Sequence, residues 1–211
     1  MSASGSCKCE ALIGALSALF GDLAWWPGTP EEVMIGAVLT QQTRWENVTA
    51  ALDALRRKGI CSIAGIHAAP SSVIEEAVRC TGFFRVKTRR LTALAEWITH
   101  RYGSVDAMRK RPTEELRAGL LSVNGIGAET ADSILCYALD RPVFVIDAYT
   151  ERICGCVGIP ERGAALKRMF EAVLPPDTAV HRRCHAYFVE YAKQFCGKKR
   201  CETCILKNAF E

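Results

Sequence analysis

A lone acid and a glycine-rich turn lie close together in the middle of the chain. Asp147 follows the apolar quartet from Val143 to Ile146, and a turn with two glycines stands about twenty residues before it. A carboxylate at the end of a buried segment can stabilise positive, oxocarbenium-like charge on a sugar and can activate water. The simpler interpretation is that Asp147 caps the helix expected after it, an interaction worth about 1 kcal/mol.

The turn reads Val123-Asn124-Gly125-Ile126-Gly127. Its glycines tolerate positive φ and allow another backbone to approach, and the amides that open the following helix form an anion site. A G-x-G between two helices is usually a simple turn. Here apolar helices flank it in the pattern L-x-x-V-x-G-I-G-x-x-T-A, the helix-hairpin-helix signature, which holds a DNA phosphate without reading sequence. The five residues of the turn are therefore candidate DNA contacts.

A polar segment from Thr40 to Trp45 gathers amides, hydroxyls, a guanidinium and an indole. Such side chains suit hydrogen bonds to base edges and stacking on a base, which makes Gln41 and Gln42 candidate DNA contacts. Polar loops are common, so this segment alone does not separate a nucleic-acid contact from a solvated turn.

A rigid aromatic turn, Trp25-Trp26-Pro27, stands near the N-terminus, and Trp45 adds a further indole. Two adjacent tryptophans cannot both face one core. Either one is a core residue and the other a lid, or at least one lines a pocket that stacks a flat ligand.

Helices have to position these residues. Apolar side chains recur at helical spacing over most of the chain, and no alternating stretch is longer than Val143–Ile146. Thr29 before Pro30 is a good helix start, and Ser72 with Glu75 resembles a capping box. We expect an all-α fold of many short helices joined by short loops, with helices that include 10–20, 45–57, 86–102, 161–173 and 177–196.

Composition bounds the class of protein. The chain has 211 residues and a net charge of +4, which is weak support for a nucleic-acid partner. It shows no secretory signal and no segment of transmembrane length, so we expect a cytoplasmic protein without membrane contact. Eleven cysteines are a high, odd number, and in a reducing compartment clustered cysteines indicate a metal or iron–sulfur site. The cluster, Cys196, Cys201 and Cys204, encloses the basic run Lys198-Lys199-Arg200.

Together these motifs resemble the endonuclease III branch of the helix-hairpin-helix DNA glycosylases. The resemblance covers nearly the whole length: Leu39–Thr43, Gly82–Lys87, the turn, Val145–Asp147 and the C-terminal cysteines. It implies a six-helix lobe over 28–139 and a second helical lobe over 1–27 plus 140–211, with DNA between them. It also implies that Gln41 enters the gap left by a flipped nucleotide and that hairpin carbonyls hold a monovalent cation.

The chain departs from this family pattern at Glu129. Family members that also cut the strand carry, two residues after the second hairpin glycine, a lysine that forms a Schiff base with the sugar. A carboxylate cannot form that imine, so we predict a monofunctional glycosylase that uses water as nucleophile. Glu129 would orient this water or contact the base; the alternative is an exposed acid favoured by the helix dipole.

A second departure concerns the cysteines. The family loop has four, and its last spacing falls here on Phe210. Three thiolates are one short of a 4Fe–4S set, for which Cys184, His185 or the Cys7/Cys9 pair are candidate fourth ligands. Zinc and a metal-free loop are alternatives. We expect a structural 4Fe–4S cluster that orders the loop, so that the basic run between the cysteines faces phosphate.

The tryptophans and the run from Glu129 to Asp132 resemble the 3-methyladenine glycosylase subgroup of that branch. Alkylated purines are cations that stack well on indole faces and leave easily, so little acid catalysis is needed. We therefore expect a base-excision glycosylase that acts as a monomer on damaged double-stranded DNA and hydrolyses the N-glycosidic bond of a base such as 3-methyladenine. The alternatives are a bifunctional glycosylase and AP lyase on oxidised pyrimidines, and a non-catalytic DNA-binding module. The expected base pocket consists of Trp25, Trp26, Pro27 and Trp45.

Overall fold

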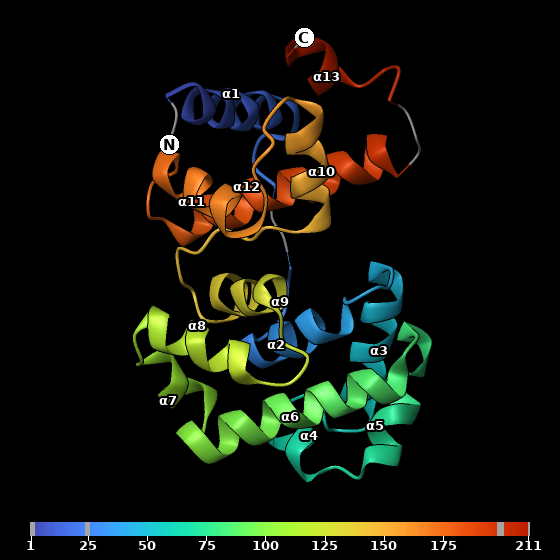
Figure 1. Ribbon diagram of the computed structural model, residues 1–211. Coiled ribbons are helices and arrows are strands. Elements are labelled where there is room, and N and C mark those ends of the chain that lie inside the picture. The colour runs from blue at the N-terminus through green and yellow to red at the C-terminus, as the bar shows by residue number, and fades with distance from the viewer. Residues whose placement is uncertain (1–2, 24–25, 198–200, 211) are drawn as a thin grey trace. The chain divides into compact units, whose positions relative to one another are not determined.

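The computed structural model describes residues 3–23, 26–197 and 201–210, and the regular elements within these ranges are all helices (Figure 1). The chain therefore has the all-α fold that its periodicity predicts. It divides into two compact units: Trp26–Leu139, here called the hairpin unit, and Met1–Trp25 together with Asp140–Glu211, here called the carboxylate unit. No helix within the described ranges is long and apolar enough to cross a membrane.

The hairpin unit is built around α2 (Pro30–Leu39), in which every residue from Val33 to Leu39 is buried. A helix without a polar face needs neighbours on all sides. It packs against α3 (Trp45–Arg57), α6 (Phe84–Tyr102) and the π-helical turn η2 (Ile134–Ala138). The other helices of this unit are α4 (Ile63–Ala68), α5 (Ser71–Val78), the short 3-10 turn η1 (Arg79–Thr81), α7 (Val105–Arg109), α8 (Thr113–Ser122) and α9 (Ala128–Ser133).

Of the two helix starts predicted from capping residues, the one at Thr29 is confirmed and the one at Ser72 is not. Thr29 caps α2 in a full capping box: its hydroxyl accepts from Glu32 N at 3.3 Å, and the Glu32 carboxylate accepts from Thr29 N at 3.0 Å. The expected box of Ser72 and Glu75 is wrong, because α5 begins at Ser71 behind an extended Pro70 and has no side-chain cap bond. Ser72 is therefore already inside the helix.

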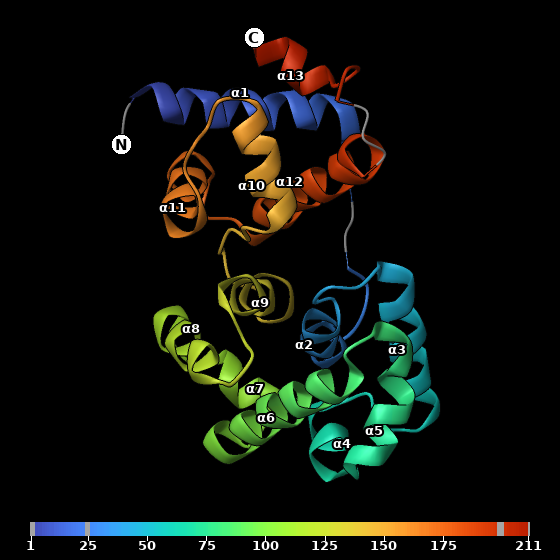
Figure 2. The same cartoon turned by 45° about the vertical axis from the view of Figure 1, so that its right-hand side comes forward.

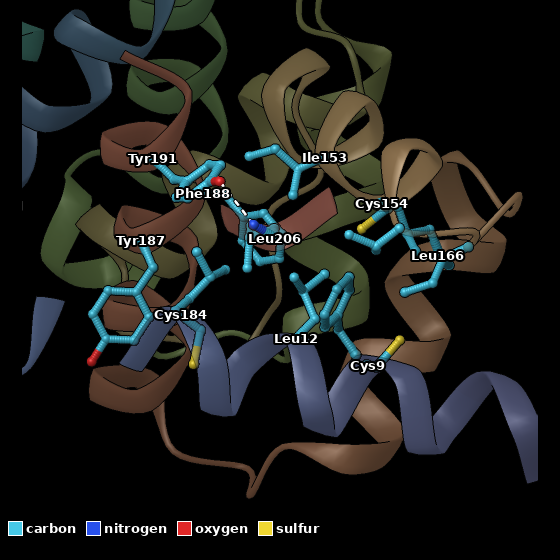
Figure 3. Packing of buried hydrophobic residues seen from close by; sticks show 14 of the residues in the cluster. Cys9, Leu12, Ile153, Cys154, Leu166, Cys184, Tyr187, Phe188, Tyr191 and Leu206 are labelled. Carbon is cyan, nitrogen blue, oxygen red and sulfur yellow. Dashed lines mark hydrogen bonds between the residues drawn. The ribbon is translucent and has the colours of Figure 1, made fainter. Parts of the chain in front are cut away.

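The carboxylate unit joins the N-terminal helix to the C-terminal part of the chain. Helix α1 (Ala3–Phe20) packs against α11 (Gly163–Val173) and α12 (Thr178–Tyr191), and α12 continues into the π-helical turn η3 (Ala192–Cys196). Helices α10 (Ala148–Cys156) and α13 (Ile205–Phe210) complete the described part. Figure 3 shows Leu12 of α1, Ile153 of α10 and Phe188 of α12 meeting in one apolar core.

The segment from Val143 to Ile146 forms no helix, and it pairs with no strand among the described residues. Phe144 is fully buried and stacks on Phe170 of α11 with ring centroids 4.5 Å apart. Its backbone N donates to Oε1 of Glu171 at 3.0 Å. These contacts fix the chain three residues before Asp147 and so determine where α10 begins.

Candidate active site

Asp147 is the N-cap of α10, as the sequence predicts. Its Oδ1 accepts hydrogen bonds from the backbone N and from Oγ1 of Thr150, each at 2.7 Å. Thr150 is fully buried. Since the cap uses Oδ1, the other carboxylate oxygen is left outside it.

That second oxygen faces α12. Oδ2 of Asp147 lies 3.5 Å from Nε2 of His185, and the two side chains are 12% and 7% exposed. Burial by itself would raise the pKa of Asp147, but the close contact with His185 and its charge, and the two bonds from Thr150, outweigh it and lower the pKa below its ordinary value. Asp147 is therefore a carboxylate at neutral pH. The sequence indicated His185 as a metal ligand and carried no signal for this contact.

The helix-hairpin-helix consists of α8, the turn and α9 (Figure 2). Val123 and Ile126 are buried, and Ile126 N donates to Val123 O at 3.1 Å, which closes the turn. Arg117 of α8 binds Asp132 of α9 through two bonds, Nε to Oδ1 at 2.7 Å and Nη2 to Oδ2 at 3.1 Å. A two-point ion pair of this kind restrains the angle between the helices as well as their distance.

The two glycines of the turn have different surroundings. Gly125 has a φ of +86°, and a Cβ there would stand 2.4 Å from Cγ of Arg90, so the group that approaches this glycine is a side chain of the protein itself. Gly127 is exposed with a φ of −87°, and the place of its Cβ is open to 4 Å. The open face of the turn is therefore at Gly127 and the amides that begin α9.

Gln41 is docked on the hairpin. Its Nε2 donates to Gly125 O at 3.1 Å and to Thr130 Oγ1 at 3.0 Å, while its Oε1 accepts from Nη1 of Arg90. Gln42 is exposed in the same turn and has a left-handed φ of +54°. Of the two glutamines expected to contact DNA, one is thus fastened to the hairpin and the other sits on a strained backbone.

A pocket of about 550 Å³ opens where the turn at residues 40–43, here called the Gln41 turn, meets α6 and the start of α9. Glu129 lines it and is exposed in the first turn of α9, a place where the helix dipole favours an acid. This position is compatible with both interpretations of Glu129: a residue that orients water or contacts the base, and an exposed acid favoured by the helix dipole. The full lining is Thr40, Gln41, Gln42, Phe83, Val86, Lys87, Arg90, Gly127, Ala128, Glu129 and Thr130.

Phe83 is a candidate DNA contact that the sequence analysis missed. It precedes α6 with a left-handed φ of +45°, which is rare for a bulky residue, and 67% of its surface is exposed. It lines the same pocket as Gln41. An exposed ring on a strained backbone suits stacking on a base. The signal in the sequence is the pair Phe83-Phe84 directly after Gly82, since two adjacent aromatic residues cannot both enter one core.

Three of the four residues of the expected base pocket, Trp26, Pro27 and Trp45, lie within the described residues. Trp26 and Trp45 meet edge to face with ring centroids 5.4 Å apart, and Tyr137, which the sequence did not indicate, lies 5.4 Å from Trp26. Both indoles are half-buried and Pro27 is exposed, whereas Trp25 lies outside the described residues. The structure therefore gathers three aromatic rings at one place of the hairpin unit.

The C-terminal cysteines share a neighbourhood. Cys196 and Cys204 are half-buried against the core, and Cys201 is exposed. Burial, and then the nearby thiols of Cys156, Cys204 and Cys201, raise the pKa of Cys196. Within the described residues no three His, Cys, Asp or Glu side chains form a metal-binding group, so the thiols are near one another without being arranged as ligands. The basic run Lys198, Lys199 and Arg200 lies outside the described residues.

Three of the residues expected as a fourth cluster ligand are engaged elsewhere than at the C-terminal cysteines. Cys184 and Cys9 lie in the apolar core, where burial raises the pKa of each to about 11 and disfavours a thiolate. His185 contacts Asp147. Cys156, at the end of α10, is the further thiol in the neighbourhood of Cys196.

An all-α chain with a helix-hairpin-helix, a glutamine docked on it and a capped, ionised aspartate defines the class of helix-hairpin-helix DNA glycosylases. The chain belongs to the HhH-GPD superfamily of base excision DNA repair proteins, whose family model matches residues 35–194. It is accordingly a DNA glycosylase.

Relatives of known name agree with this class. The chain is 41% identical to a Methanocaldococcus jannaschii protein named provisionally as a DNA repair glycosylase, over 90% of this chain and 89% of that one. It is 27% identical to endonuclease III of Thermotoga maritima, over 86% and 83% of the two chains. The solved structure of H. pylori 3-methyladenine DNA glycosylase bound to 1,N6-ethenoadenine matches with a TM-score of 0.80 and 30% identity, over 89% of this chain and 97% of that one.

Proposed function

We propose that this glycosylase is monofunctional: it flips out a damaged base, an alkylated purine such as 3-methyladenine, and hydrolyses the N-glycosidic bond with water. The observation that carries the proposal is the state of Asp147. Its pKa lies below the ordinary value, so a charged carboxylate is present at neutral pH with Oδ2 outside the helix cap. Glu129, where strand-cutting relatives have a lysine, offers no amine for a Schiff base.

Hydrolysis of the N-glycosidic bond of an alkylated purine needs little catalytic help beyond the negative charge of Asp147. The bond from C1′ of the sugar to the purine nitrogen breaks, and its electron pair cancels the positive charge of the alkylated base. The sugar is left as an oxocarbenium ion, which Asp147 stabilises. Water then adds to C1′ and loses its proton to solvent. Because a carboxylate of low pKa is a weak base, the electrostatic contribution of Asp147 exceeds its contribution as a proton acceptor.

The hairpin unit would hold the DNA. A phosphate oxygen fits the open amides at Gly127 and the start of α9, while Gln41 and Phe83 are the side chains for the disrupted stack. The Gly125 carbonyl accepts one bond from Gln41 and keeps a lone pair for the monovalent cation that we also propose here. We propose damaged double-stranded DNA as the partner, bound by a single copy of the chain.

The aromatic group supports a purine substrate. Trp26 and Trp45 offer indole faces, on which a cationic base is attracted by about 0.5–2 kcal/mol. The H. pylori relative is a 3-methyladenine glycosylase seen with a purine adduct. The test is mass-spectrometric identification of the bases released from methylated and from oxidised duplexes. Release of methylated purines alone is expected; release of oxidised pyrimidines alone would overturn the substrate assignment.

One observation favours the alternative of a bifunctional lyase. Lys87 lines the pocket, and burial, followed by the charge of Arg90, lowers its pKa to about 8, which makes it a better nucleophile than an ordinary lysine. Its Nζ, however, donates to Leu39 O at 2.9 Å and to Thr81 O at 2.8 Å. We therefore expect no adduct when abasic DNA is treated with borohydride. An adduct that disappears in Lys87→Met would establish the lyase.

A structural 4Fe–4S cluster on Cys196, Cys201 and Cys204 stays part of the proposal, with Cys156 as the fourth thiol. Four thiols match the donor set of such a cluster, and the loop would have to close around it, as metal binding commonly orders its ligands. The cluster would order the loop and take no part in base removal. Visible absorbance with iron and sulfide analysis tests it. Cys156→Ser should lose iron and Cys7→Ser should not, and an iron-free wild type would end the proposal.

A further inference from the structure

The amide of Gln41 has its hydrogen-bonding groups engaged by the hairpin turn and by two helices, α9 and α6. Nε2 has two hydrogens, and it donates to Gly125 O and to Thr130 Oγ1. Oε1 accepts from the guanidinium of Arg90 on α6. The side chain is half-buried, so water does not readily replace these partners.

The partners also determine which way the amide points. The Gly125 carbonyl can only accept a hydrogen bond, and the Arg90 guanidinium can only donate one. A flipped amide would place oxygen against oxygen at Gly125 and NH₂ against guanidinium at Arg90. The arrangement therefore has a single orientation, and removing Arg90 removes one of the two groups that select it.

Helix α6 holds the Gln41 turn at a second point. Lys87, one helical turn before Arg90, donates from Nζ to Leu39 O at the end of α2 and to Thr81 O. Lys87 thus fixes the backbone just before Gln41, and Arg90 fixes the side chain of Gln41 itself. The stem of Arg90 also lies on Gly125, where a Cβ would stand 2.4–2.6 Å from its Cγ, Nε and Cδ.

We propose that Arg90 is a positioning residue: it holds the side chain of Gln41, which would fill the gap left by a flipped nucleotide, against the hairpin. The phosphate site of the hairpin and the gap-filling side chain then approach the DNA as one rigid unit. This inference rests on the proposed function and adds to it a residue that touches no reacting atom. The competing role for an arginine in this basic stretch is a direct phosphate contact, and the exposed neighbour Arg89 on the same helix provides the matched control.

The first experiment uses the protein without DNA. Urea midpoints are measured for Arg90→Met, which keeps the apolar stem on Gly125, for Gln41→Ala, and for the double variant. The expected midpoint of the double variant equals that of the less stable single variant, because each substitution breaks the same contact. Additive losses would show that the contact contributes no coupling, and would overturn the proposal.

The second experiment measures affinity for a duplex with a tetrahydrofuran abasic analogue and for the same duplex undamaged. The wild type is expected to prefer the abasic duplex. Arg90→Met and Gln41→Ala should each reduce this preference about tenfold, and the double variant no further, whereas Arg89→Ala should weaken both duplexes equally.

The outcomes distinguish failure of the positioning role of Arg90 from failure of the proposed function. If Arg90→Met weakens both duplexes equally, as Arg89→Ala is expected to, Arg90 is a phosphate contact and the positioning role is wrong. If the losses in preference are additive, Arg90 acts independently of Gln41 and the role is wrong as well. If the wild type itself has no preference for the abasic duplex, the proposed function fails, whatever coupling the free protein shows.

Discussion

Oδ2 of Asp147 and Nε2 of His185 lie 3.5 Å apart, in a largely buried contact between α10 and α12. The other oxygen of the same carboxylate caps α10 through Thr150. The helix cap therefore uses Oδ1, and the proposed chemistry would use the charge on Oδ2. For this reason substitutions can separate the stability that Asp147 provides from the charge that it presents.

Asp147→Asn should remove the charge and keep the cap, because asparagine caps helices about as well as aspartate. We expect base release to fall by about 10²–10³-fold and the free energy of unfolding to change by about 1 kcal/mol or less. Single-turnover release and urea unfolding measure the two effects. Asp177→Asn is the control, since Asp177 caps α12 through Ala179 N and Val180 N. Unchanged release by Asp147→Asn would remove Asp147 from the mechanism.

His185→Gln should move the pH dependence of base release. Burial raises the pKa of Asp147 and His185 opposes it, so loss of the imidazole raises this pKa. Asp147 then protonates at a higher pH, and the acid limb of the rate profile shifts upward. The stability that Asp147 adds is present above its unfolded pKa and is lost as the pH falls through its folded pKa, so this loss should also begin at higher pH in the variant. His67→Gln, at an exposed position of α4, should leave both profiles unchanged.

Alanine at the two hairpin glycines should have opposite consequences. Gly127→Ala should lower the free energy of unfolding by only about 1 kcal/mol or less, because the site is open, φ is ordinary and only the preference for glycine at the N-cap of α9 is lost. It should weaken binding to undamaged duplex by crowding the phosphate. Gly125→Ala should destabilise the protein by about 1–3 kcal/mol, since it combines a positive φ with a clash against Arg90. Fluorescence anisotropy and urea unfolding provide the two readouts. Gly14→Ala, at an open position inside α1, is the control: it should leave DNA affinity unchanged and raise the free energy of unfolding by about 0.5–1 kcal/mol. Normal DNA affinity in Gly127→Ala would contradict the phosphate site.

Asp132→Asn should loosen the hairpin. Asp132 is 3% exposed and binds Arg117, whose side chain is 33% exposed, at two points, so its loss leaves the arginine with a neutral partner and should cost about 1.5–3 kcal/mol. Asp53→Asn breaks an exposed pair with Arg56 and should cost about 0.2–1 kcal/mol. Urea unfolding compares the two, and equal costs would show that the pair of Arg117 and Asp132 does not hold α8 to α9.

Lys87 should make the stability depend on alkaline pH. Burial and then Arg90 lower its pKa to about 8 in the folded protein, below its value in the unfolded chain. Between these two pKa values the unfolded chain binds more protons, so the stability of the wild type rises with pH. Lys87→Met lacks this rise. The difference in unfolding free energy between wild type and variant should therefore grow by about 2 kcal/mol from about pH 8 to pH 10. Parallel stability curves would show that the lysine is not perturbed.

The features that the sequence predicts are those encoded by neighbouring residues. Apolar spacing gave the all-α fold, Thr29 before Pro30 gave the start of α2, and Asp147 before Ala148 gave the cap of α10. Each depends on hydrogen bonds that reach three or four residues along the chain. The cap expected at Ser72 failed for an equally local reason, the extended Pro70 that starts α5 one residue earlier.

The tertiary structure decided which side chains meet. Gln41 bonds to Gly125, 84 residues away in the chain, and Arg90 takes the space above that same glycine. His185 meets Asp147 because α10 packs on α12. No local pattern encodes these contacts, because each depends on the angle and register at which two helices pack and on the side-chain direction that results. The sequence by itself therefore determined the helices and the kinds of reactive group. Packing determined their partners, their burial and, for Asp147, the lowered pKa.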